Sequence, residues 1–143
     1  MTRTPGELAA LVAEFRALPA DDDRRRAIIA ELDGDPGAEP FLIGVVADPE
    51  EYDLARTEAA TLLRLWPPAD PEVRREAGRA LLAALDDPEE DLVRQYAAMA
   101  LGPYADAPAV RRALTAAAEA GDDPLVRAAA RSALAEAGPD GAA

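Results

Sequence analysis

The fold is decided by residues 79–101, RALLAALDDPEEDLVRQYAAMAL, which recur 33 positions later as residues 112–134, RALTAAAEAGDDPLVRAAARSAL. A weaker form of the pattern, an arginine followed seven residues later by a leucine, begins at Arg25 and at Arg56. The arginine spacings of 31, 38 and 33 residues are typical of helix pairs, which bury their apolar faces by stacking on neighbouring pairs. The sequence therefore predicts four stacked helical hairpins.

Composition and boundary residues agree with this division. Ala and Leu, the strongest helix formers, supply 36 and 17 of the 143 residues. Thr4-Pro5-Gly6-Glu7 has the form of a capping box, and Asp70-Pro71-Glu72 is a similar helix start. We expect an all-α protein, a right-handed α-solenoid in a single domain. Its pairs are expected at about residues 4–34, 38–66, 70–104 and 108–137, with a disordered tail at residues 138–143.

The residue types that are missing exclude most catalytic chemistry. The chain has no Cys, His or Lys, so a nucleophile would lack its usual base, and zinc and copper would lack their usual ligands. We therefore expect no catalytic residue, no bound metal and no cofactor. No apolar stretch is long enough to span a membrane, and the first ten residues lack the pattern of a signal peptide. A cytoplasmic location is expected.

The net charge of −13 indicates which classes of partner the protein can bind. Such a charge repels the phosphates of nucleic acids and anionic lipid surfaces, and it attracts basic protein surfaces. We expect a protein partner with a basic surface, and neither nucleic acid nor membrane as a ligand.

The run from Asp122 to Leu134 resembles a known repeat. It follows the pattern Asp-Asp-Pro-x-x-Val-Arg-x-x-Ala-Ala-x-x-Ala-Leu with one residue fewer before Val-Arg, and so is similar to the HEAT-like repeats of the phycocyanobilin-lyase type. The resemblance covers about residues 38–137 well and the first pair weakly. Proteins with such repeats serve as adaptors, inhibitors, lyases and DNA glycosylases, so the resemblance implies architecture more than function.

The resemblance also implies a ladder of ion pairs between repeats and a concave face lined by the second helices. The ladder arginines would be Arg25, Arg56, Arg94 and Arg127. Their acidic partners would lie three or four residues earlier: Asp21 or Asp22, then Asp53, then Glu90 or Asp91, and finally Asp123.

Acidic residues gather in the predicted turns inside the pairs, among them Glu50, Glu51, Glu89 and Glu90. One interpretation is that they only cap helices and complement helix dipoles. The other is that the stacked turns form an acidic edge that receives a basic partner, because the acids outnumber the caps. Neither acidic run has the spacing of a calcium-binding EF-hand loop.

Further candidates for partner binding lie on the predicted concave face and among the aromatic residues. On the predicted concave face, helical geometry gives four outward-pointing side chains, those of Arg64, Gln95, Met99 and Arg131. Met99 could instead pack on an adjoining pair. Trp66 and Tyr104 each lie ten residues after a ladder arginine. They either fill the junctions between pairs or form exposed anchors. Tyr52 is the aromatic residue expected to be most exposed.

These features predict a non-catalytic protein-binding scaffold or adaptor that uses a concave helical face and an acidic edge. One alternative is an immunity or inhibitor protein that neutralises a basic toxin or nuclease. Another is an enzyme like the HEAT-type lyases or glycosylases, which the missing residue types disfavour. The alanine-rich last pair could also hold a second copy of the chain.

Overall fold

The computed structural model describes residues 2–139 and, over that range, contains helices and turns but no strand. The predicted all-α class is confirmed. The α-helices are α1 (Pro5–Ala17), α2 (Arg24–Glu31), α3 (Glu39–Ala47), α4 (Asp53–Leu65), α5 (Pro71–Leu85), α6 (Asp91–Ala100), α7 (Pro108–Ala120) and α8 (Pro124–Ala137). Two 3-10 turns, η1 (Pro36–Ala38) and η2 (Gly102–Tyr104), precede α3 and follow α6. Residues 140–143 of the expected disordered tail lie outside the described residues.

The helix starts follow the expected cap chemistry. The Thr4 hydroxyl accepts the Glu7 amide, and the Glu7 carboxylate accepts the Thr4 amide, which is the predicted capping box. The Asp70 carboxylate accepts the amides of Glu72 and Val73 at the start of α5. These bonds satisfy amides that have no partner inside the helix, so α1 and α5 begin at the residues that follow their caps.

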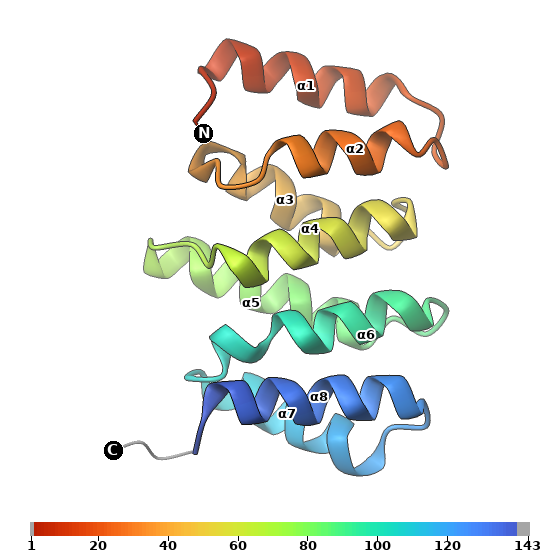
Figure 1. Ribbon diagram of the computed structural model, residues 1–143, viewed down its shortest axis with the longest axis vertical. Coiled ribbons are helices and arrows are strands. Elements are labelled where there is room, and N and C mark those ends of the chain that lie inside the picture. Colours follow the sequence, from red (N-terminus) through yellow and green to blue (C-terminus); the bar gives the residue numbers. More distant parts are fainter. Residues whose placement is uncertain (1, 140–143) are drawn as a thin grey trace.

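The helices are arranged in two layers (Figure 1). Helices α2, α4, α6 and α8 stack in chain order in one layer, and α3, α5 and α7 lie behind them, while α1 lies next to α2 at the end of the stack. The turns inside the pairs gather at one edge, on the right in Figure 1, and the links between pairs gather at the other. In the first layer, α2 packs closely on α4, α4 on α6 and α6 on α8. In the second layer, α5 and α7 contact each other little.

Small residues allow this close stacking. Ala55, Ala59, Ala77, Ala97 and Ala98 are fully buried, so the backbones of neighbouring helices can approach closely. Larger side chains fill the space between the two layers, and the ones that are fully enclosed include Ile28, Ile29, Leu32, Leu63, Leu81, Leu101 and Leu114. The hydrophobic core therefore runs along the whole stack rather than gathering at one centre.

Candidate functional site

Arginine side chains hold the turns inside the pairs. Each of the four ladder arginines donates to a backbone carbonyl at or just after the end of the first helix of its own pair, where unpaired carbonyls and the helix dipole favour a cation. The acceptors are Leu18 and Pro19 for Arg25, Val46 for Arg56, Asp87 for Arg94 and Gly121 for Arg127. The four arginines thus share one structural role.

Two of them also reach the acidic turn of the next pair. Arg25 lies 2.8 Å from the Glu51 carboxylate, and Arg56 lies 2.9 Å from the Asp87 carboxylate. The second pair is deeply buried, with the side chains of Arg56 and Asp87 only 3% and 6% exposed. Burial raises the pKa of Asp87, but the hydrogen bonds from Arg56 and from the Glu89 and Glu90 amides outweigh it and leave this pKa lowered.

The predicted acidic partners were wrong for Arg25, Arg56 and Arg127. Asp22, Asp53 and Asp123 instead accept backbone amides of Arg24, Leu54 and Leu125, because their short side chains turn onto the first turns of their own helices. Asp21 makes no side-chain contact with a polar group in residues 2–139. Only Arg94 pairs with a predicted acid, Asp91.

The ladder is interrupted between the third and fourth pairs. Asp87, the acid that receives Arg56, lies seven residues before Arg94, and the residue seven before Arg127 is Ala120. Asp122 does occupy the other place, five residues before Arg127, that Glu51 holds before Arg56, yet Arg94 pairs with Asp91 of its own helix. A groove of about 1040 Å³ lies at this junction, between the turns of the two pairs.

This groove is lined by acidic and apolar residues, together with the ladder arginine Arg94. The carboxylates of Asp86 and Asp122 line it with those of Asp91 and Asp123, and alanines of α7 form much of the remaining surface. Leu125, which is 61% exposed, also lines it. A site of this kind suits a segment that presents both basic and apolar side chains. We refer to it as the acidic groove.

The acids of the turns divide into two groups. Some cap helices or join the ladder, as the structural interpretation of their role predicted. Six others make no side-chain hydrogen bond or ion pair with any residue from 2 to 139: Asp21, Glu50, Asp86, Glu89, Glu90 and Asp122. All six lie in the turns at the edge on the right of Figure 1, and we call them the acidic edge. Their carboxylates are therefore open to contacts with another molecule.

Of the acids predicted for partner binding, Glu50, Glu89 and Glu90 belong to the acidic edge. Glu51 does not, because its half-buried carboxylate is occupied by Arg25. Sequence spacing could not separate Glu51 from Glu50, since only the packing of the first pair on the second decides which of them meets an arginine.

The residues predicted for the concave face are largely engaged within the protein. Arg64 of α4 pairs with Glu136 of α8 at 2.8 Å, and Arg131 donates to the Ala118 carbonyl at the end of α7. Gln95 is half-buried, and Met99 is half-buried and packs on the core. Of the two possibilities for Met99, outward or packed, the structure has it packed, and the two arginines already have partners. The acidic edge is therefore the better candidate for binding.

The equivalent aromatic residues have different environments. Tyr104 is buried and donates its hydroxyl to the Leu63 carbonyl at 2.7 Å, so it fills the junction between pairs and cannot be an exposed anchor. Trp66 is 57% exposed. Tyr52, expected to be the most exposed, is half-buried against the core, and burial, followed by the nearby charge of Asp23, raises its pKa.

Trp66 borders a pocket that the sequence did not reveal. Its indole N–H donates to the Asp33 carboxylate at 2.6 Å, and the neighbouring Leu65 is also 57% exposed. The pocket, of about 280 Å³, is lined mostly by leucines, prolines and Trp66, together with the carboxylate of Glu39. Burial and the charge of Asp70 raise the pKa of Glu39. The apolar run Leu65-Trp66-Pro67 just past a helix was the only signal, and nothing in the sequence linked it to Glu39.

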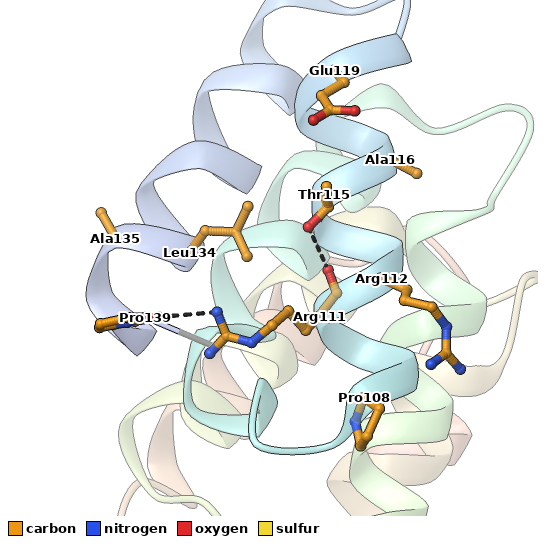
Figure 2. A pocket seen from close by; sticks show the side chains of 10 residues that line it. Pro108, Arg111, Arg112, Thr115, Ala116, Glu119, Leu134, Ala135 and Pro139 are labelled. Atoms are coloured by element: carbon orange, nitrogen blue, oxygen red, sulfur yellow. Dashed lines mark hydrogen bonds between the residues drawn. The ribbon is translucent and has the colours of Figure 1, made fainter. Parts of the chain in front are cut away.

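A shallow hollow of about 1090 Å³ lies on the last pair (Figure 2). Arg111 and Glu119 lie on α7 at its rim, Leu134 of α8 faces it, and Arg111 donates to the Gly138 carbonyl at 3.0 Å. In the preceding repeat Gly78 stands in place of Arg111, and Leu82 in place of Thr115. The last pair is thus more polar at these positions. Self-association through it stays a prediction that the molar mass in solution would test.

Residues 2–139 contain no cluster of acidic side chains arranged to hold a metal ion. None of the described helices combines the length and apolar character needed to cross a membrane. Comparison of the chain with protein-family models, with curated proteins and with solved structures gives no match.

Proposed function

We propose that this protein is a non-catalytic protein-binding module, a HEAT-like α-solenoid that docks a basic partner on its acidic edge. The observation that carries the proposal is the set of six turn carboxylates without partners in residues 2–139, next to a groove lined by acidic and apolar residues. Carboxylates that make no hydrogen bond or ion pair within residues 2–139 are available to a partner, and a chain of charge −13 attracts a basic one over long range.

The repeated roles of the ladder arginines support the solenoid. Each closes the first helix of its own pair, and two of them tie that pair to the next one. The same contact made once per repeat is what a stack of equivalent units requires.

The chemistry of the available side chains supports a binding role over catalysis. General acid–base or nucleophilic catalysis at neutral pH uses groups whose pKa is moved toward neutrality and which meet a substrate in a cleft. Asp87 is paired with Arg56, and its pKa is moved away from neutrality. Glu39 has a raised pKa and lines a pocket, but the other acid of that lining, Asp35, already accepts the amides of Arg3 and Gly37 and is not free to act with it. The acids of the edge stand in solvent-exposed turns, where they attract a partner but have no base or nucleophile beside them.

The test compares two double variants that change the net charge equally. Asp86→Asn/Asp122→Asn removes two carboxylates from the acidic groove, and Glu76→Gln/Glu119→Gln removes two unpaired carboxylates from the outer helices α5 and α7. Each protein serves as bait in lysate of the native source at about 50 mM and 500 mM salt, conditions in which the screening length of surface charge differs severalfold.

We expect the wild type to capture a basic protein at low salt and to lose it at high salt. The groove variant should retain that protein roughly fivefold less well, because two favourable surface charges contribute about 1 kcal/mol together. The outer-helix variant should behave as the wild type. Equal losses in both variants would mean that only net charge matters, and capture that is insensitive to salt would contradict docking by the acidic edge.

A further inference from the structure

We propose that the pocket beside Trp66 binds an arginine side chain presented by a protein partner. Many of the residues that line this pocket belong to the links that follow α2 and α4, and Figure 1 places the links between pairs at the edge opposite the acidic edge. The inference therefore goes beyond the proposed function and does not depend on the acidic groove. It rests on three features: a fixed and exposed indole, a carboxylate without a partner, and an apolar lining of suitable size.

The indole of Trp66 is held in place before any ligand arrives. Its N–H is fixed by Asp33 at 2.6 Å, and Pro67 follows it in the chain, yet more than half of its surface stays exposed. A large aromatic side chain that is exposed and already ordered loses little entropy on binding, and exposed tryptophans of this kind are the anchors at which binding energy concentrates. Leu65 extends the apolar surface beside it.

Glu39 supplies the charge that selects a cation. Its half-buried carboxylate lines the pocket and makes no hydrogen bond or ion pair with any residue from 2 to 139. Among the described residues no arginine lines the pocket, and the buried carboxylate of Asp35, which also lines it, already accepts the amides of Arg3 and Gly37. Partial burial and, after it, the charge of Asp70 act against the ionised form of Glu39 and raise its pKa. A cation at this position would relieve both effects.

Arginine fits these features better than the alternatives. Its guanidinium stacks on an indole face and can bond a carboxylate through two N–H groups, while its methylene stem covers apolar surface. A pocket of about 280 Å³ has room for one long side chain and not for a helix. Lysine would provide charge without stacking, and a neutral apolar side chain would leave Glu39 unpaired in a less hydrated site.

The test uses the single tryptophan of the chain as its reporter. Fluorescence of Trp66, and the resonance of its indole N–H, are followed while blocked tripeptides Gly-X-Gly are added, where X is arginine, lysine, norleucine or citrulline. Citrulline has the shape of arginine without its charge. We expect a saturable response to the arginine peptide with a dissociation constant in the millimolar range, as suits one side chain, and at least tenfold weaker binding of citrulline.

Glu39→Gln tests the carboxylate, and Glu119→Gln, an exposed change on α7, is its control. We expect Glu39→Gln to weaken arginine binding at least tenfold, to the level of citrulline, and Glu119→Gln to leave it unchanged. Tighter binding of lysine than of arginine would overturn the assignment to arginine, and equal binding of arginine and citrulline, or no saturable response, would overturn the site. The peptide comparison uses the wild type, so it decides the matter even if Glu39→Gln does not fold.

The outcome is separable from that of the proposed function. Asp86→Asn/Asp122→Asn changes the opposite edge and should leave arginine binding at Trp66 unaltered. If the peptides do not bind, the proposal for the acidic edge still stands. If the edge variants bind the partner as the wild type does, the proposal for the Trp66 pocket still stands.

Discussion

Replacing Arg56 with methionine is expected to lower the free energy of unfolding by about 3 to 5 kcal/mol, because it leaves the buried Asp87 carboxylate without its cation. The Arg56 side chain is 3% exposed, and it donates both to Asp87 and to the Val46 carbonyl, so no water can readily replace it. Urea unfolding followed by circular dichroism measures the change.

Arg94→Met is the matched control. Arg94 occupies the equivalent place in the third pair and closes the end of α5, but its carboxylate partner is the exposed Asp91 rather than an acid of the next turn. Its loss should cost about 1 kcal/mol, the value of a helix-end hydrogen bond with a weak surface ion pair. Equal losses for the two variants would mean that the contact between pairs contributes nothing.

The Arg56–Asp87 contact should also weaken in acid. The pKa of Asp87 is lower in the folded protein than its ordinary value, so the folded state holds the proton less tightly than the unfolded state does. Its contribution to stability is complete above the ordinary carboxyl pKa and is lost as the pH falls through the lowered one. The difference in stability between wild type and Asp87→Asn should therefore shrink below about pH 4. A difference that stays constant down to pH 2 would contradict this assignment.

Tyr104→Ala is expected to destabilise the fold by about 3 to 5 kcal/mol, as removal of a buried aromatic ring does. Tyr104 is 2% exposed, its hydroxyl donates to the Leu63 carbonyl, and the Arg74 guanidinium lies 4.9 Å from the centre of its ring. Tyr104→Phe should lose about 1 to 3 kcal/mol of this, because the Leu63 carbonyl is left unsatisfied. Thermal unfolding measures both variants.

Trp66→Ala is the natural comparison, since Trp66 occupies the equivalent place in the preceding pair. With most of its ring in solvent and one hydrogen bond to Asp33, its removal should cost about 1 kcal/mol or less. A large loss at Trp66 would show that its ring supports the fold, which would weaken its assignment as a binding surface.

The sequence predicted the helices well because their signals are local. The repeat of 33 residues, the capping box at Thr4 and the cap at Asp70 each act within a few residues, and the observed helices begin where these signals stand. The four ladder arginines share one role, since all four close the first helix of their own pair, but only Arg25 and Arg56 form an ion pair with the next pair.

The contacts of the candidate site could not be predicted in the same way, because they join residues far apart in the chain. Arg64 meets Glu136 across 72 positions, and Arg56 meets Asp87 across 31. Tyr104 and Trp66 occupy equivalent positions but differ in burial, since only Tyr104 finds an acceptor, the Leu63 carbonyl, inside the fold. One local signal was present in the sequence: Ala120 occupies the position that is equivalent to Asp87 in the preceding repeat.

The most direct test of the central claim is hydrogen–deuterium exchange of the protein alone and with its captured basic partner. Docking on the acidic edge predicts that added protection gathers at residues 86–91 and 121–125, the turns that border the acidic groove, and that it fades as salt is raised. Protection confined to the hollow on the last pair, or to the links between pairs, would contradict the account.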